Sequence, residues 1–281
     1  MKKLKVFDVH IHFCPLEENY DKAIEGLFKY SEQCNVVKMC LISDLGKERI
    51  VEKVFKQYPE KFIGYAHPNL DLDEPRVIKA YYERGFKGLK VINTERNYDD
   101  PKYFKFYELA EQLAMVVLFH TGVIGGAYDY LLNEKSSLVE EMKGKNKQTN
   151  NKKKKKSSSA RMRSIFLDTI AINFPDLKMI GAHLGWPEYM MSCAIARWRK
   201  NLYFDISGGE VVRRHIIEGG YISKEISTGK LVFGTDSSID KMPIRISNWY
   251  YSLRSIGLSD VEIEKIFYFN AAKIFGIGDS K

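Results

Sequence analysis

Five residues whose side chains can bind a metal or transfer a proton each end, or lie within, a short apolar run. They are His10 and His12 in VFDVHIHF, His120 in MVVLFH, His183 in LKMIGAH and Asp236 in LVFGTD. Imidazole and carboxylate groups are common protein ligands of Zn²⁺ and similar ions. The chain contains six histidines in all, so the placement of four of them in such runs predicts one assembled metal site.

The apolar runs that carry these residues have the pattern of buried β-strands, and helical patterns separate them along the chain. Alternation of strand and helix predicts a parallel sheet, and a (β/α)8 TIM barrel brings the carboxyl ends of its strands to one face. We therefore expect a single TIM-barrel domain over residues 1–281. The expected strands are Lys5–Phe13, Val37–Ser43, Phe62–Ala66, Gly88–Ile92, Met115–His120, Leu177–His183, Leu202–Ile206 and Leu231–Asp236.

Two of the intervening helices have clear start signals. Asp100 followed by Pro101 is typical of a helix beginning, with the aspartate as cap and the proline in the first turn. Ser259 and Glu262 have the spacing of a capping box before a further apolar stretch.

Side-chain alternation along the strands predicts which residues face the barrel interior. In the first strand, His10 and His12 point into the barrel mouth, and Phe7 and Val9 face the helices. Asp8 lies one step deeper on the inward face, as a carboxylate that could support a metal ligand. Alternation in the other strands that carry site residues gives the same division between inward and outward positions. It places Ile180 and Ala182 outward. It places these residues inward: Leu118, His120, Gly181, His183, Gly234 and Asp236.

The chain resembles the amidohydrolase superfamily, in its amidohydrolase-related branch of metal-dependent TIM-barrel hydrolases and decarboxylases. The resemblance covers nearly the whole chain outside one insertion, and the order and spacing of its motifs are more specific than any single motif. The residues that carry it are Asp8-Val-His10-Ile-His12, His120-Thr-Gly, His183-Leu-Gly, Gly234-Thr-Asp236 and Asn270-Ala-Ala-Lys-Ile-Phe.

The resemblance implies that His10, His12, His120 and Asp236 bind one divalent ion, preferably Zn²⁺, and leave a position open for water or substrate. The same ligands would accept Mn²⁺, Fe²⁺ or Co²⁺. A bound ion would lower the pKa of its water to about 7. Asp236 would then accept the proton of that water, and His183 would steady or protonate the developing charge.

Lys90 falls on the inward face of the expected strand Gly88–Ile92 and has three interpretations. It resembles the position at which binuclear members of the superfamily carry a carboxylated lysine that bridges two ions. It could equally be a free ammonium that binds a substrate carboxylate. The third interpretation is a lysine at the barrel rim whose charged end reaches solvent. The number of bound ions distinguishes the first interpretation from the others.

Other polar and aromatic residues are expected to line the pocket at the mouth. His67 and Trp186 are candidates to contact the substrate, since each follows a strand end. Asp205 points inward and is expected to be a hydrogen-bonded barrel residue. Arg96, Tyr128 and Tyr130 could meet an anionic or aromatic substrate from the loops.

The net charge of +8 comes from one low-complexity insertion at about residues 143–159, after the fifth strand. Residues 142–159 contain eight lysines and no acidic residue, and the remaining 36 basic residues match the 36 acidic ones. Because the charge is confined to this segment, we expect no specific nucleic-acid partner. The segment lacks apolar residues to bury, so we expect it to be disordered, and we expect removal of residues 145–158 to leave fold and metal content unchanged.

Three functions fit these observations. The first is a metal-dependent hydrolase that uses a metal-activated water on an amide, lactone or related bond of a small polar substrate. The alternative is a metal-dependent, non-oxidative decarboxylase of an aromatic or unsaturated carboxylic acid. Hydrolysis is favoured because the core of this chain is shorter than that of the decarboxylating relatives. A non-catalytic binding barrel is the least favoured reading, because it would give these five residues no reason to remain together.

The remaining sequence features concern the compartment and the partners. Four cysteines without paired spacing favour a reducing, cytoplasmic environment over a disulfide framework. The N-terminus runs directly into the first expected strand, which argues against a cleaved signal, and apolar runs are too short to span a membrane. We expect a small-molecule substrate and no membrane partner, and a homodimer is compatible with the resemblance.

Overall fold

The computed structural model describes residues 4–125 and 158–278. Within these residues, eight parallel strands pair in sequence order. All eight expected strands are present, although β6 and β8 are shorter than expected. The strands are β1 (Val6–His12), β2 (Val36–Ile42), β3 (Phe62–Ala66), β4 (Gly88–Val91), β5 (Val116–Phe119), β6 (Met179–Gly181), β7 (Leu202–Asp205) and β8 (Leu231–Val232).

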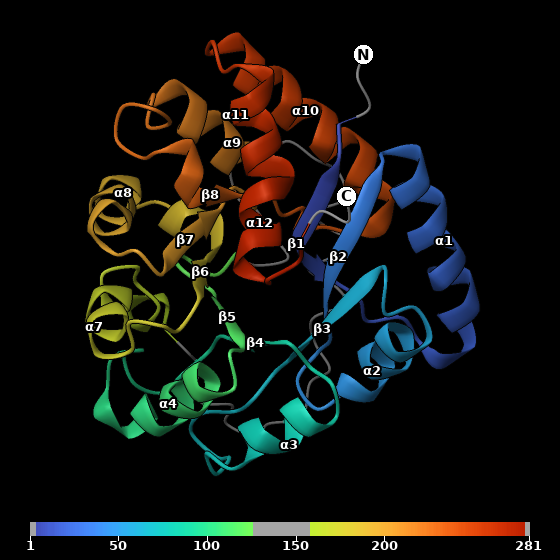
Figure 1. The fold of residues 1–281 in the computed structure, drawn as a ribbon, viewed down its shortest axis with the longest axis vertical. Helices are drawn as coiled ribbons and strands as arrows, with labels where there is room; N and C mark the ends of the chain where they lie inside the picture. Colours follow the sequence, from blue (N-terminus) through green and yellow to red (C-terminus); the bar gives the residue numbers. More distant parts are fainter. Residues whose placement is uncertain (1–3, 126–157, 279–281) are drawn as a thin grey trace, which may run out of the picture.

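Backbone hydrogen bonds between β1 and the end of the β8 segment close the sheet into a ring. Val9 N donates to Phe233 O at 3.0 Å, and Asp236 N donates to His10 O at 2.7 Å. Figure 1 shows this ring at the centre of the molecule with helices around it. The architecture is therefore the predicted (β/α)8 TIM barrel, and its closure brings β1 and Asp236 side by side.

Helices follow the strands around the outside of the ring (Figure 1). Both predicted start signals are confirmed: Asp100 accepts from Lys102 N before the 3₁₀ turn Pro101–Tyr103, and Ser259 with Glu262 forms a capping box. The helices are α1 (Tyr20–Gln33), α2 (Glu48–Gln57), α3 (Val77–Glu83), α4 (Phe104–Gln112), α7 (Phe166–Asn173), α8 (Tyr189–Trp198), α9 (Gly209–Glu218), α10 (Met242–Ser255), α11 (Asp260–Glu264) and α12 (Asn270–Ile274), with a π-helical turn at Lys265–Phe269 between the last two.

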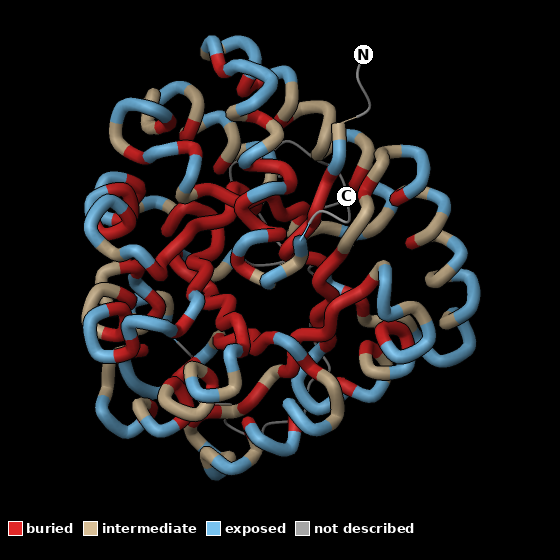
Figure 2. Tube along the Cα trace, viewed as in Figure 1, coloured by how far each residue is buried: buried red, intermediate tan, exposed pale blue. Residues whose placement is uncertain are grey.

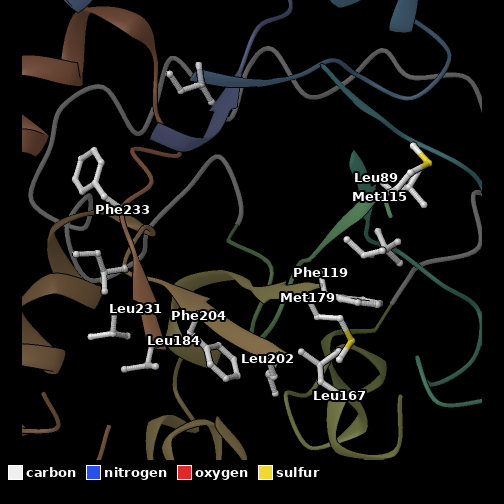
Figure 3. Close-up of a cluster of buried hydrophobic side chains, with 14 of the residues drawn as sticks. Leu89, Met115, Phe119, Leu167, Met179, Leu184, Leu202, Phe204, Leu231 and Phe233 are labelled. Atoms are coloured by element: carbon white, nitrogen blue, oxygen red, sulfur yellow. The ribbon is translucent and has the colours of Figure 1, made fainter. Parts of the chain in front are cut away.

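Most of the core lies between the barrel and the surrounding helices. Figure 3 shows part of this layer, in which Phe119, Met179, Phe204 and Phe233 project from the strand segments toward the helices. Figure 2 shows the same division, with buried strands at the centre and exposed outer helix faces. Burial of side chains of this size stabilises the fold by roughly 1.5–3 kcal/mol each, so this layer holds the strand ends in place.

A second, smaller cluster fills the barrel interior at the end opposite the expected site. Tyr65 and Leu118 from the strands pack in one cluster with Ala271 and Ile274 of α12, and Figure 1 shows α12 across the ring of strands. Asn270 fixes this helix because its Nδ2 donates to Thr228 O and Leu231 O, both at 2.7 Å. Substrate access is therefore confined to the end where the strands terminate.

The predicted alternation in β1 is wrong for its first half. Phe7 and Val9, expected against the helices, lie in the interior cluster, whereas Ile11 belongs to the outer layer. The physical reason is a β-bulge, since the pairing with β2 shifts register between Asp8 and Ile11. The extra residue lets Val9 and His10 both face inward, and it restores the predicted orientation for His10 and His12.

The predicted alternation in β6 is also wrong. Ile180 and Ala182 lie in the interior cluster instead of facing the helices. Gly181, expected inward, faces outward, because a Cβ there would overlap the Phe204 ring of the outer layer. Strand alternation therefore does not explain why His183 reaches the barrel mouth.

Several expectations fall on residues 126–157, which lie outside the described part of the chain. They include most of the lysine-rich segment, and also Tyr128 and Tyr130. The two described flanks of this segment are bonded to each other, since Ile124 N donates to Ser159 Oγ at 3.0 Å. None of the helices described is long and apolar enough to cross a membrane.

Candidate metal centre

Three of the predicted metal ligands converge at the mouth of the barrel. His10 and His12 at the end of β1 place their Nε2 atoms 3.3 and 3.2 Å from Asp236 Oδ1. One potential ligand atom from each of the three residues lies within 4.8 Å of the others. Two imidazoles and a carboxylate at this spacing could hold a divalent cation.

His120 follows β5 and faces the same space, although it lies outside this group of three. Its ring centroid is 5.1 Å from that of His183. Burial and the nearby His183 hold the pKa of His120 well below its ordinary value. Its Nε2 is buried and has no hydrogen-bond partner among the described residues. A buried ring nitrogen without a partner is costly, and a metal ion at this position would satisfy it. The donor set therefore fits a divalent cation.

Asp205 at the end of β7 sets the orientation of the His10 ring. Its Oδ2 lies 2.8 Å from His10 Nδ1. Burial alone would raise the Asp205 pKa, but His10, His183 and Ser207 hold it below its ordinary value. An ionised carboxylate can only accept a hydrogen bond, so His10 Nδ1 donates and Nε2 keeps its lone pair. This is the arrangement that orients a metal-binding histidine.

Asp8, which the sequence analysis proposed for this supporting role, does not contact a histidine ring. Its Oδ1 accepts from His10 N at 3.0 Å and from Thr235 N at 3.1 Å. Burial raises the pKa of Asp8 to about 7. The bulge in β1 turns this carboxylate toward the backbone, so it braces β1 against the segment after β8 instead of supporting a ring.

Lys90 on β4 faces inward as predicted and is 1% exposed. Its Nζ lies 3.0 Å from His10 Nε2. Burial lowers the pKa of Lys90 to about 8, although Asp236 and Asp205 act in the opposite direction. Burial and the proximity of Lys90 lower the pKa of His10 to about 4, so a neutral imidazole beside an ammonium is the state that this geometry favours.

His183 reaches the mouth through an unusual backbone conformation. Its φ of 58° is left-handed, and the chain turns there instead of continuing β6. The turn is held because His183 N donates to Asp205 Oδ1 at 2.8 Å, while its Nδ1 lies 2.8 Å from Ser207 Oγ. His183 Nε2 then lies 3.6 Å from Asp236 Oδ2, so the two residues predicted to handle protons are neighbours.

Asp236 also has a left-handed backbone, with φ of 43°. Burial alone would raise its pKa, but His10, the hydrogen bond with His12, His183 and Lys90 together hold the pKa below its ordinary value. The carboxylate is thus ionised and surrounded by nitrogen atoms on several sides. A group in this position can bind a cation, accept a proton or do both in turn.

A cavity of about 600 Å³ opens above these residues. One wall is largely apolar and includes Ile92, Ile124, Trp186 and Val212. Trp186 is therefore where the sequence analysis expected it. His67 is not among the described lining residues, and Arg96 pairs with Asp100 at 3.1 Å away from the cavity.

Two features of the site were missed or undervalued in the sequence. Asp205 was expected to be an ordinary hydrogen-bonded residue, and only the fold shows that it contacts His10 and the His183 backbone. Arg245 on α10 lines the cavity, yet its sequence context MPIRIS carries no site signal. The sequence did carry one signal for Asp205, because strand alternation places it and Ser207 on the same inward face. In the structure, Ser207 Oγ donates a hydrogen bond to Asp205.

Three solved structures match nearly the whole chain at low sequence identity. A putative amidohydrolase from Staphylococcus aureus is 18% identical, with 97% of this chain and 99% of that chain covered and a TM-score of 0.62. A 2,6-dihydroxybenzoate decarboxylase from Rhizobium is 14% identical, with 97% and 99% covered and a TM-score of 0.63. A dihydroxybenzoic acid decarboxylase from Polaromonas, solved with bound manganese, is 14% identical, with 97% of both chains covered and a TM-score of 0.61. At these identities the likeness supports the barrel fold alone.

Comparison with curated proteins finds no match. The sequence model of the family described as Amidohydrolase matches residues 47–277, which is most of the chain. The match includes His120, His183 and Asp236, and the structure adds the histidine pair of β1 to them. The chain belongs to the amidohydrolase family of metal-dependent TIM-barrel enzymes, as its motifs predicted.

Proposed function

We propose that this chain is a metal-dependent, non-oxidative decarboxylase of a small aromatic or unsaturated carboxylic acid. The observation that carries the proposal is the position of Lys90, whose buried ammonium lies beside His10 at the floor of a cavity with an apolar wall. An apolar wall suits a ring or an unsaturated skeleton, and the ammonium suits an acidic oxygen attached to it. The decarboxylases from Rhizobium and Polaromonas support this alternative over the hydrolase that the sequence analysis favoured.

We assign His10, His12, His120 and Asp236 as the ligands of one divalent ion. When bound, the ion would orient substrate oxygens and polarise the bonds next to them. The preference for Zn²⁺ stays part of the proposal, and Mn²⁺ suits three imidazoles and a carboxylate as well. The manganese in the Polaromonas enzyme supports testing both ions.

The residues of the chain provide the remaining steps. Lys90 holds an acidic oxygen of the substrate, and its fixed charge stabilises negative charge that develops nearby. As the bond to the carboxylate breaks, carbon dioxide leaves and the electron pair remains on the substrate carbon. Asp236, which is ionised beforehand, accepts a solvent proton relayed by His183, whose Nε2 lies 3.6 Å from Asp236 Oδ2. It then delivers this proton to the substrate carbon and returns to its ionised form. Trp186 and Ile124 limit the access of water to this step.

Hydrolysis of an amide or lactone is the second candidate. It is favoured by Asp236 Oδ1, which lies within 3.3 Å of two histidine nitrogens and could accept a proton from a water held there. The short core does not favour hydrolysis over decarboxylation, because the fold of this chain matches the Rhizobium decarboxylase over 99% of that chain.

The direct test is a product assay with protein purified without chelator and loaded with Zn²⁺ or Mn²⁺. Hydroxybenzoates and other unsaturated acids would be screened for release of carbon dioxide, and lactones and amides for hydrolysis. We expect carbon dioxide release that is lost in the double variant His10→Ala/His12→Ala and after chelation. Hydrolysis without carbon dioxide release would support the second candidate, and activity that survives in the double variant would contradict both.

A further inference from the structure

We infer that Arg245 binds a second acidic oxygen of the substrate and thereby selects acids that carry two such groups. The inference rests on the proposed function, which places the first acidic group, the reacting carboxylate, beside Lys90. Arg245 belongs to α10, lines the same cavity and has no counterpart among the motifs of the sequence analysis. The lining of the cavity therefore includes two basic side chains, Lys90 and Arg245, together with several apolar residues.

The guanidinium of Arg245 is available for a ligand. Its Nε is buried and has no hydrogen-bond partner in the described residues, and no described carboxylate forms an ion pair with this side chain. Glu210, which also lines the cavity, accepts a hydrogen bond from Arg213 Nε at 3.0 Å, and the charges of Arg213 and Arg245 both lower its pKa. A buried donor without a partner is costly, so an acidic oxygen that enters the cavity gains a hydrogen bond that the protein does not already make.

The position of Arg245 relative to the proposed metal ligands follows from two glycines at the start of α9. A Cβ on Gly208 would lie 2.9 Å from His183 Nδ1, whereas a Cβ on Gly209 would lie 3.5 Å from Arg245 Nη2. Gly208 is thus against the metal side of the cavity and Gly209 against the guanidinium. Because neither glycine has a side chain, a flat molecule can lie against the backbone of Gly208 and Gly209, with one end at His183 and the other at Arg245.

This geometry defines a substrate class. The acid would carry its reacting carboxylate near Lys90 and a second carboxylate or phenolic oxygen on the far side of an unsaturated skeleton. A guanidinium offers two parallel donors to a carboxylate, so a second carboxylate fits best. The cavity of about 600 Å³ has room for a ring with two substituents.

The test compares a monoanion with a dianion of the same ring. Binding of benzoate and of isophthalate to the metal-loaded protein is measured by calorimetry in the wild type, in Arg245→Gln and in Arg245→Lys. We expect the wild type to prefer isophthalate, and Arg245→Gln to weaken isophthalate binding roughly tenfold to a hundredfold while leaving benzoate unchanged. Arg245→Lys keeps the charge and should recover part of the preference. Arg254→Gln, on the same helix but paired with Asp260 on the surface, is the matched control and should change neither ligand.

The outcomes separate this inference from the proposed function. If the wild type shows no preference for isophthalate, including the case in which neither ligand binds, the assignment of Arg245 is overturned. Equal weakening of both ligands in Arg245→Gln would indicate a structural role and would also overturn it. If the preference is present and depends on Arg245 while no acid in the screen releases carbon dioxide, the assignment stands and decarboxylation is the part that fails.

Discussion

Lys90 Nζ lies 3.0 Å from Nε2 of His10, the nitrogen that we assign to the metal. The proton on Nδ1 is held by Asp205, so the lone pair of Nε2 is the one that Lys90 approaches. An ammonium and a bound cation repel each other at this range. As an ammonium, Lys90 therefore does not bind the ion, and its favourable partner is an acidic oxygen.

This relationship predicts the behaviour of Lys90→Met. The variant should keep one ion per chain with affinity at least equal to that of the wild type, because a like charge has been removed. KM for the acid substrate should rise roughly tenfold to a hundredfold, the loss expected for one charged hydrogen bond. Elemental analysis and steady-state kinetics check the two parts. The control is Lys87→Met, because Lys87 lies just before β4 and is exposed near the other end of the barrel. Two ions in the wild type and one in Lys90→Met would instead establish a carboxylated, bridging lysine.

The second prediction contrasts two buried carboxylates near His10. Asp205→Asn keeps an oxygen for the His183 and Ser207 backbone amides but turns an NH₂ group toward His10 Nδ1. The ring would then favour the tautomer with its proton on Nε2, where the metal should bind. We expect metal affinity to fall roughly tenfold to a hundredfold, the usual cost of losing such a supporting contact.

Asp8→Asn is the matched variant for this experiment. Asp8 is equally buried, but its Oδ1 accepts from the backbone N–H groups of His10 and Thr235 and contacts no histidine ring, and an asparagine oxygen can accept in the same way. Metal affinity per folded molecule should stay at the wild-type value, with any loss confined to the free energy of unfolding. Metal titration alongside urea unfolding separates the two quantities. Equal loss of affinity in both variants would refute the assignment of Asp205 as the residue that orients His10.

These residues also show what the sequence could predict. The barrel, its strands and the convergence of His10, His12 and Asp236 followed from apolar runs with polar ends, because the closing of a parallel barrel brings those ends together. Alternation failed where the backbone departs from a regular strand. The bulge in β1 and the left-handed turn at His183 are set by contacts with neighbouring strands, which a single sequence does not display.

The inward position of Asp205 was predicted, but its contact with His10 and the role of Arg245 were not, for a different reason. Asp205 is an aspartate at the end of a buried strand, and its importance comes from a ring 195 positions away in the chain. Arg245 comes from a helix, and its availability depends on Glu210 being engaged by Arg213. Partner choice of this kind is decided by packing between distant elements, not by local pattern.

The third prediction concerns the glycine that borders His183. Gly208 has a φ of +100°, and a Cβ there would meet His183 Nδ1 and Val212 at 2.9 Å. Gly208→Ala should therefore displace the ring from Ser207 and lower kcat by at least tenfold, while His10, His12 and Asp236 still bind the metal. Gly46→Ala is matched for backbone strain, because Gly46 has a φ of +80° but nothing within 4 Å of its Cβ position. Both variants should lose about 1–2 kcal/mol of stability, and only Gly208→Ala should lose turnover. Similar kcat values in the two variants would show that the His183 contact is unimportant.

The last prediction concerns the lysine-rich segment. Its described flanks are tied to each other, since Gly122 N donates to Met162 O and Ile124 N donates to Ser159 Oγ, both at 3.0 Å. A shortened connection can therefore join two points that the fold already holds together, and the entropy of closing a loop changes only slowly with its length. Removal of residues 145–157, which retains the Ser158 cap of the following turn, should leave the melting temperature and metal content unchanged. The variant loses seven lysines, so its net charge should fall close to zero and its binding to a cation-exchange resin should weaken. A lower melting temperature together with loss of metal would show instead that this segment supports the mouth of the barrel, and the substrate screen would then need the full chain.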